Sequence, residues 1–348
     1  MPVTDLTGGL GVEAEFGLKD QPDIALMREG VSVWVYDDEG RFGLPRIALE
    51  AIGPDWDQRK LQVNVAFADG RVVIGSCDAP AGPREDAEGL LSVYSGGPLE
   101  FRCLEPFQRW SVTFDGPAID TTEAQTAIRT TFQEPKVRLR FELEVAMVVP
   151  PWITGTMLPG ADAALEGTDA QFVGGQRSAE GAMRYEQLFR STGRLVIDDE
   201  EWTFDGSGLR IHRQGLRNLG EFTGHVWQSA VFPSGKAFGY MWLLPFDYKE
   251  GFVYEDGQML PARIVQAPFM SKMLPAGEDV SVVLETERGR HEIRGETAYS
   301  VFIRHDEPFW TERENRLEWQ QGGVRFTWDG ESAYGMMERS TLPDAMEA

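Results

Sequence analysis

Every second residue is apolar in the clearest segments of this chain. In residues 137–145, Val, Leu, Phe, Leu and Val alternate with Arg or Glu. A period of two places the apolar side chains on one face of a β-strand and the charged side chains on the other. Residues 107–114 and 31–36 have similar patterns, with Trp110 and Trp34 as aromatic strand residues. The pattern predicts antiparallel sheets that each have one solvated face.

Turn signals separate these segments at short intervals. Four dipeptides between strand-like segments are typical of β-hairpins: Asp69-Gly70, Ser234-Gly235, Asp256-Gly257 and Gly322-Gly323. The chain also contains 38 Gly and 20 Pro, which favours many turns over long helices. Helical periodicity is scarce, and only residues 121–130 and 181–188 are expected to form short helices. The sequence therefore predicts an all-β protein with few short helices.

The length and a weak internal repeat indicate two domains. A chain of 348 residues is long for one domain and sufficient for two. Residues 65–73 resemble residues 230–238, since each segment reads as a strand, a turn, a basic residue and a second strand. The segment 150–175 between them is rich in Pro and Gly and weakly patterned. We therefore expect an N-terminal β-domain over 1–165 and a C-terminal β-domain over 166–348 that carries the candidate site.

The net charge excludes several classes of partner. At −23 the chain would repel a phosphate backbone, and it has no Lys/Arg run that could bind nucleic acid or an anionic membrane. The N-terminal residues lack the pattern of a signal peptide, and no apolar stretch approaches the roughly 20 residues of a membrane span. We expect a cytoplasmic protein without stable membrane insertion. Its two cysteines, Cys77 and Cys103, are then expected to be reduced and structural.

The polar residues concentrate in residues 205–242. On extended strands, Arg210, His212 and Gln214 would share one face, because alternate side chains point the same way. Two further pairs alternate on the following segments: His225 with Trp227, and Tyr240 with Trp242. Neighbouring strands could therefore bring His, Arg, Trp and Tyr around one cavity. The 10 Trp and 20 Phe of the chain suit the walls of an apolar pocket.

Several segments resemble a known superfamily. They read Arg-Tyr-Glu-Gln-Leu at 184–188, Thr-Gly-Arg-Leu-Val-Ile-Asp at 192–198 and Phe-Asp-Gly-Ser-Gly-Leu-Arg-Ile-His at 204–212, with further similarity at 33–36, 43–47 and 104–110. Together they resemble the AttH-like and hydroxyneurosporene synthase (carotenoid hydratase) superfamily over most of the chain. The resemblance implies two consecutive lipocalin-like antiparallel β-barrel or sandwich domains. It also implies hydration, dehydration, isomerisation or cyclisation of apolar substrates without a redox cofactor.

The family's motif is only partly present. Its usual run is Arg-Asp-His-x-Trp-Gly-x-Arg-Asp. Four residues match it (Arg210, His212, Gly215 and Arg217), and three differ (Ile211 for Asp, Gln214 for Trp and Asn218 for Asp). Without the carboxylate beside the histidine, protonation of an alkene becomes doubtful. The additional cation Arg213 suggests instead that a phenolate, carboxylate or enolate is stabilised.

Each candidate residue has a structural and a functional interpretation. His212 is either a general acid/base or a histidine that ties a loop to the barrel. Arg210, Arg213 and Arg217 either offset oxyanion charge or form ion pairs. Tyr254 either donates a proton or binds backbone. The expected substrate-binding residues, which could equally be core, are His225, Trp227, Tyr240, Trp242, Gln214 and Trp34.

Three hypotheses for the function follow. The first is a cofactor-independent lyase, hydratase/dehydratase or isomerase that transfers protons on a hydrophobic small molecule such as an isoprenoid, a steroid or a lignin-like aromatic. The second is a non-catalytic carrier or sensor of such a ligand, and the third is an interaction scaffold with an exposed apolar patch. The four histidines lack the spacing of a zinc site and no phosphate-binding loop is present, so no metal or cofactor is expected. The sequence is compatible with a homodimer.

Overall fold

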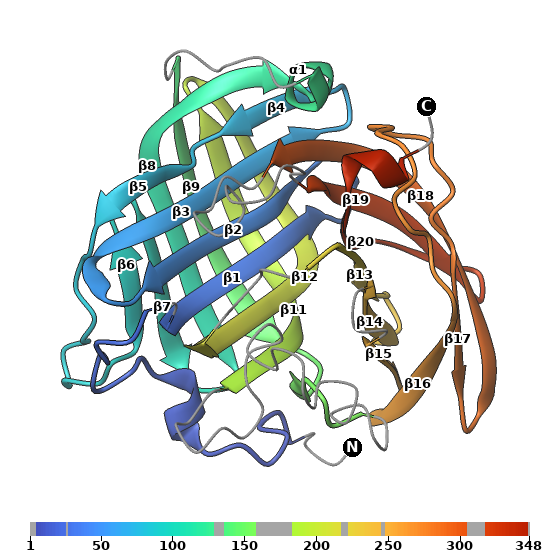
Figure 1. Ribbon diagram of the computed structural model, residues 1–348, viewed down its shortest axis with the longest axis horizontal. Helices are drawn as coiled ribbons and strands as arrows, with labels where there is room; N and C mark the ends of the chain where they lie inside the picture. Colours follow the sequence, from blue (N-terminus) through green and yellow to red (C-terminus); the bar gives the residue numbers. More distant parts are fainter. Residues whose placement is uncertain are drawn as a thin grey trace.

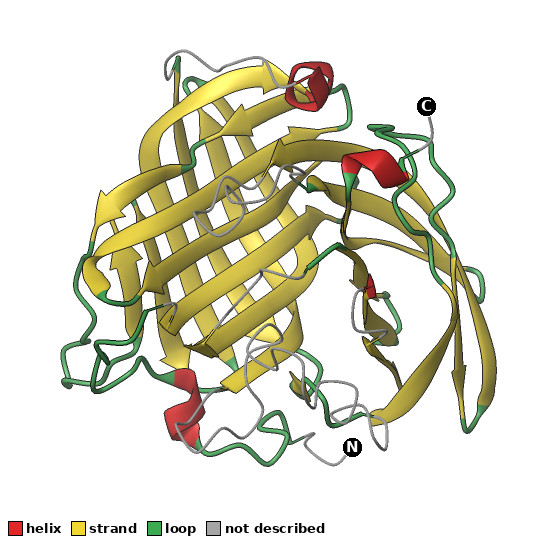
Figure 2. Cartoon of the chain, in the orientation of Figure 1, coloured by secondary structure: helices red, strands yellow, loops and turns green. Residues whose placement is uncertain are grey.

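The computed structural model describes residues 5–25, 27–128, 136–157, 183–216, 222–244, 248–304 and 317–346. Strands make up nearly all of the regular structure (Figure 2). They form two barrels that lie side by side (Figure 1). The predicted all-β fold with few short helices is confirmed.

The first barrel closes through eight antiparallel strands. In ring order these are β11 (Met183–Ile197), β12 (Glu200–Leu216), β1 (Met27–Asp37), β2 (Phe42–Ile52), β3 (Asp55–Phe67), β4 (Arg71–Ile74), β8 (Arg109–Thr122) and β9 (Val137–Met147). The ring closes because β9 pairs with both β8 and β11. Four shorter strands extend it: β5 (Cys77–Pro80), β6 (Val93–Gly96), β7 (Leu99–Glu105) and β10 (Trp152–Ile153). The predicted strand 137–145 is β9, with Leu139, Phe141, Leu143 and Val145 buried in the barrel.

The second barrel is a closed ring of eight strands that follow one another along the chain. They are β13 (Gly224–Val231), β14 (Ala237–Leu243), β15 (Tyr248–Glu255), β16 (Gln258–Gln266), β17 (Val282–Thr286), β18 (Gly289–Arg304), β19 (Glu318–Trp328) and β20 (Glu331–Thr341). The repeated segments occupy different places, since 65–73 spans β3 and β4 whereas 230–238 spans β13 and β14.

The change from one barrel to the other falls between Leu216 and Gly224, later in the chain than the expected boundary at 165/166. Strands β11 and β12 follow that boundary, yet they pair with β9 and β1 and complete the first barrel. Residues 205–216 therefore belong to the first barrel and not to the C-terminal one. Alternation identifies a strand but not the sheet in which it pairs.

The helices are few and short. Helix α1 (Glu123–Ile128) lies within the predicted segment 121–130, and 3-10 turns lie at η1 (Val12–Glu15) and η5 (Pro343–Ala345). The helix expected at 181–188 is wrong for its described part, which begins strand β11. Residues 184–189 are all buried, because both faces of this part of the strand are covered by other parts of the protein. Such a strand lacks the alternation that marks a half-exposed one. No helix among the described residues is long and apolar enough to cross a membrane.

Three large apolar clusters hold the structure together, beside a small one formed by Ala14, Phe107 and Tyr185. One fills the first barrel and another fills the second. The third lies between the barrels, where β1, β2 and β12 contact β13, β19 and β20. Trp34 and Trp227 belong to this third cluster, one from each barrel. The two cysteines are unpaired, Cys77 exposed and Cys103 buried.

Candidate active site between the barrels

Strand β12 presents its two faces to different environments. Arg210 and His212 lie opposite Val33 and Val31 of β1, which belong to the core of the first barrel. Ile211 belongs instead to the cluster between the barrels, and Arg213 shares its face. Arg210, His212 and Gln214 thus share a face, as the sequence predicts, but Arg213 points the other way.

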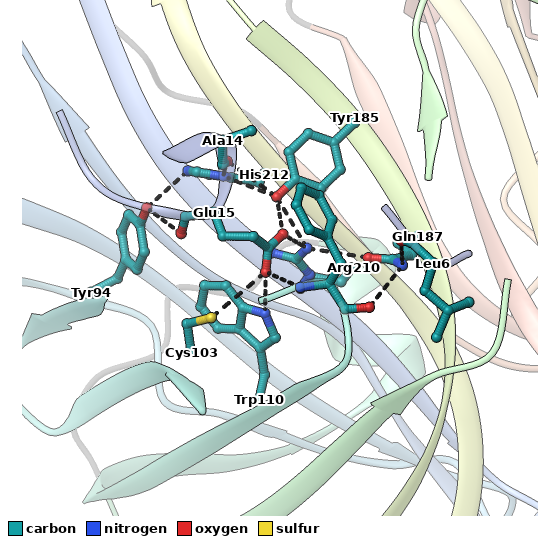
Figure 3. A network of polar contacts seen from close by, with 11 residues as sticks. Leu6, Ala14, Glu15, Tyr94, Cys103, Trp110, Tyr185, Gln187, Arg210 and His212 are labelled. Atoms are coloured by element: carbon teal, nitrogen blue, oxygen red, sulfur yellow. Dashed lines mark hydrogen bonds and ion pairs between the residues drawn. The ribbon is translucent and has the colours of Figure 1, made fainter. Parts of the chain in front are cut away.

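Glu15 lies at the centre of a polar network at one end of the first barrel (Figure 3). Its carboxylate forms an ion pair with Arg210 and accepts hydrogen bonds from Tyr185 and from Trp110 Nε1, the latter at 2.7 Å. It also accepts the backbone N–H of Phe107 at 3.2 Å. Burial alone would raise the pKa of Glu15, but Arg210, Tyr185 and the other partners lower it below its ordinary value. We call Glu15, Tyr94, Trp110, Tyr185, Arg210 and His212 the barrel-end network.

His212 is fully engaged within this network. Its Nδ1 lies 2.8 Å from the backbone oxygen of Ala14, and its Nε2 lies 3.0 Å from the hydroxyl of Tyr94. Burial and the nearby Arg210 lower the pKa of His212 to about 4, so the ring is neutral at pH 7. Neither His212 nor Arg210 lines any of the cavities described below. These contacts match the structural interpretation of both residues, in which they tie the η1 segment to the barrel.

A small cavity lies on the opposite face of β12, between the barrels. Its volume is about 40 Å³. Apolar and aromatic side chains form much of its wall: Trp34, Ile211, Phe222, Trp227, Met241 and Leu243. The polar side chains at its wall are Ser32, Arg46, Arg184, Arg213, His225 and Glu338. We call this space the inter-barrel cavity, and Arg46, Arg184 and Arg213 the cavity arginines.

His225 sits beside a carboxylate in this cavity. Its Nε2 lies 3.4 Å from Glu338 Oε1, and its Nδ1 lies 2.7 Å from Ser340 Oγ. Burial lowers the pKa of His225, with Glu338 acting in the opposite direction. Burial would raise the pKa of Glu338, but Arg46, His225 and Gln321 together lower it to about 2. At neutral pH a neutral imidazole therefore faces an ionised carboxylate.

The cavity arginines are held by carboxylates from the first and second barrels. Glu50 pairs with Arg213, and with Arg28 at 2.9 Å. Arg184 pairs with Glu186 at 2.6 Å, and Arg46 lies 3.4 Å from Glu338 across the two barrels. Burial raises the pKa of Glu186 to about 7 against the effect of Arg184 and of Trp227, which donates to it at 3.1 Å. The cavity is therefore strongly polarised as well as aromatic.

The profile of a family described as a domain of unknown function (DUF7064) matches residues 18–343. The chain belongs to this family. No curated protein matches the sequence significantly.

Among solved structures, a candidate AttH from Nitrosomonas europaea is similar over 96% of this chain and 98% of its own, with 15% identity and a TM-score of 0.56. CghA is similar over 91% and 89%, with 12% identity and a TM-score of 0.56, and its structure with Sch210972 gives 0.54. These similarities confirm the two-barrel lipocalin-like fold that the resemblance to AttH-like proteins implies.

The predicted substrate-binding residues divide between three places. Trp34, His225 and Trp227 line the inter-barrel cavity together, with Arg213. Gln214 belongs to the first barrel, where its amide donates to the backbone oxygen of Phe16 at 2.8 Å. Tyr240 and Trp242 face away from the inter-barrel cavity, because β14 presents Met241 and Leu243 to it. Tyr240 instead donates to Gln228 at 2.8 Å, and the Trp242 ring packs on Phe269.

The two remaining candidates lie elsewhere. Tyr254 lines a separate groove of about 1450 Å³ that also involves Arg190, Lys236 and Tyr334. It is therefore not part of the inter-barrel cavity. Arg217 lies outside the described residues. No cluster of His, Cys, Asp and Glu suited to a metal ion occurs among the residues that the structure describes.

The carboxylates of both sites, Glu15 and Glu338, are not among the residues that the sequence predicts. Glu15 lies in a short 3-10 turn near the N-terminus, where no periodic pattern marks it. Glu338 had a detectable signal, since it follows Met336-Met337 and shares the face of Met336 on a strand. A charged residue on an otherwise apolar face indicates a buried charge with a partner or a function.

Proposed function

We propose that the protein is a cofactor-independent lyase, hydratase/dehydratase or isomerase that transfers a proton on a hydrophobic small molecule. The proposal places the reaction in the inter-barrel cavity and assigns the proton transfer to His225 rather than His212. The observation that carries it is a neutral histidine beside an ionised glutamate within an aromatic wall. Titratable groups with shifted pKa values in an enclosed site are typical of catalysis.

The contacts of His225 suit a general base. The shorter contact joins Nδ1 to Ser340 at 2.7 Å, whereas Nε2 and Glu338 are 3.4 Å apart and both residues line the cavity. In the resting protein Nε2 donates to Glu338 and Nδ1 accepts from Ser340. Proton transfer uses the other tautomer, in which Nδ1 carries the proton and donates to Ser340 and Nε2 accepts a proton from the substrate. The imidazolium formed in this way would face the carboxylate of Glu338, which stabilises it.

The cavity arginines supply the complementary charge. Removal of a proton next to a carbonyl, or loss of a hydroxyl group, develops negative charge on oxygen. Arg46, Arg184 and Arg213 line the same cavity as His225. Their fixed positive charge in a buried site would stabilise that oxygen in the transition state more strongly than it would in water.

Deuterium exchange tests the proposal. The wild-type protein is incubated in deuterated water with a panel of lipophilic alcohols, phenolics and organic acids, and mass changes are recorded. We expect deuterium incorporation, gain or loss of water, or cleavage of at least one compound. H225Q should abolish that change, whereas H291Q, at a half-buried histidine of the second barrel, should retain it. Full activity of H225Q would refute the assignment.

A carrier or sensor is the second candidate. The observation that favours it is the enclosure of His212, which hydrogen-bonds the Ala14 backbone and reaches neither cavity. A carrier predicts that a compound binds to the wild-type protein and is recovered unchanged from deuterated water. In that case H225Q would bind the compound as the wild type does.

A further inference from the structure

Four hydrogen-bond donors at the inter-barrel cavity have no acceptor in the part of the chain that the structure describes. Trp34 Nε1 and the Nε atoms of the three cavity arginines are buried and find no hydrogen-bond partner among the described residues. Each cavity arginine directs its terminal nitrogens to Glu50, Glu186 or Glu338. A buried donor without an acceptor is destabilising, so such groups rarely gather in one place without a ligand or water.

The charge at the cavity wall is also unbalanced. Among the described residues, three arginines and one carboxylate, Glu338, line it. Glu50 and Glu186 pair with these arginines but do not line the cavity. Burial lowers the pKa of Arg213 to about 10. The neighbouring Arg28, Arg184 and Arg46 also lower it, whereas Glu50 raises it. An anion in the cavity would offset this mutual repulsion of the arginines.

The dimensions restrict the anion. About 40 Å³ corresponds to roughly three water-sized positions, which matches the three non-hydrogen atoms of a carboxylate. Two aromatic rings flank the site: Trp34 and Trp227 meet edge to face with centroids 4.9 Å apart. Arg46 lies over the ring of Trp34 at 5.6 Å and Arg184 over that of Trp227 at 5.5 Å. Planar donors fixed against aromatic rings suit a planar acceptor group.

We propose that the inter-barrel cavity is a carboxylate-binding subsite, and that the substrate is a hydrophobic organic acid. Its carboxylate accepts hydrogen bonds from Trp34 and from the Nε groups of the cavity arginines. The cavity holds the carboxylate alone, beside its apolar residues Phe222, Met241 and Leu243, and the rest of the acid extends beyond it. That the bound acid is a substrate rests on the proposed function. That the cavity binds a carboxylate does not depend on any reaction.

Binding measurements with matched probes test the subsite. Octanoate is compared with octan-1-ol, and 4-phenylbutyrate with 4-phenylbutan-1-ol, by isothermal titration calorimetry at pH 7.5 and constant ionic strength. We expect each acid to bind the wild-type protein at least tenfold more tightly than its alcohol. Equal affinities of acid and alcohol, or no binding of either acid, would overturn the proposal. Tighter binding of inorganic phosphate than of the acids would overturn the choice of carboxylate.

One variant and one control isolate the site. W34F keeps a ring and removes the Nε1 donor, so it should weaken acid binding about tenfold and leave alcohol binding within about twofold. W152F removes another buried Nε1 without a described partner, at a residue that packs on Phe252 and does not line the cavity. It should bind both probes as the wild type does. An equal loss in both variants would contradict the subsite.

Further variants separate the two proposals. R213M should remove the preference for acids, and circular dichroism establishes that it is folded. H225Q should still bind the acids. Acid binding without any deuterium exchange in the wild type would refute the proton-transfer function and leave the subsite standing. Exchange on a neutral compound without acid binding would refute the subsite and leave the function standing.

Discussion

The Nδ1 atom of His212 lies 2.8 Å from the backbone carbonyl oxygen of Ala14. A carbonyl oxygen only accepts, so Nδ1 carries the ring proton and Nε2 accepts from the hydroxyl of Tyr94 at 3.0 Å. Both nitrogens of the histidine in the family-like motif are therefore used to hold the η1 turn against the barrel. The contacts of His212 therefore match a structural role. The inter-barrel cavity lies on the other face of its strand, β12.

Replacing Glu15 should be strongly destabilising. E15Q would leave Arg210 buried without its carboxylate, and breaking a buried ion pair in this way costs about 3–5 kcal/mol. Urea unfolding measures the change. E13Q alters an exposed glutamate of the same 3-10 turn and should change the free energy of unfolding by less than about 0.5 kcal/mol. Similar losses in the two variants would show that the barrel-end network contributes nothing specific.

His212 should make the protein less stable in acid. Its pKa is about 4 in the folded protein and 6.5 in the reference state, so between these values the unfolded chain binds more protons. Stability from this group is complete above pH 6.5 and decreases as the pH falls towards 4, by about 3 kcal/mol in total. Urea unfolding from pH 4 to pH 7 should give a shallower pH dependence for H212Q than for the wild type. H291Q serves as the control, and an unchanged slope in H212Q contradicts the prediction.

Glu186 should act in the opposite direction. Burial raises its pKa from 4.5 to about 7, so between these values the folded protein binds more protons than the unfolded chain. Its contribution makes the protein less stable as the pH rises from 4.5 to 7, by about 3 kcal/mol. The stability of E186Q relative to the wild type should therefore rise from pH 5 to pH 8, on top of a pH-independent cost of leaving Arg184 without its carboxylate. E142Q, at an exposed residue of β9, should show no such gain. If the two variants respond alike, Glu186 is not the titrating group.

Much of the candidate site could be predicted as separate pairs of residues. Alternation correctly placed Arg210 with His212, and His225 with Trp227, on common faces. Alternation could not decide which face of β14, and therefore which barrel surface, Tyr240 belongs to. The register pairs Trp227 with Met241, so Tyr240 lies opposite Gln228 and faces the core of the second barrel. A shift of one residue in register exchanges the two faces of a strand, and hydrophobic pattern does not fix it where both faces are buried.

The sequence by itself determined that the chain forms antiparallel strands, because a period of two in hydrophobicity is a local property of the backbone. It also determined which side chains of β12 point the same way. Only the tertiary structure decided that β11 and β12 complete the first barrel, that Glu15 meets Arg210, and that Glu338 meets His225. These contacts join residues far apart in the chain, and they exist because two barrels close and pack together, which no local pattern encodes.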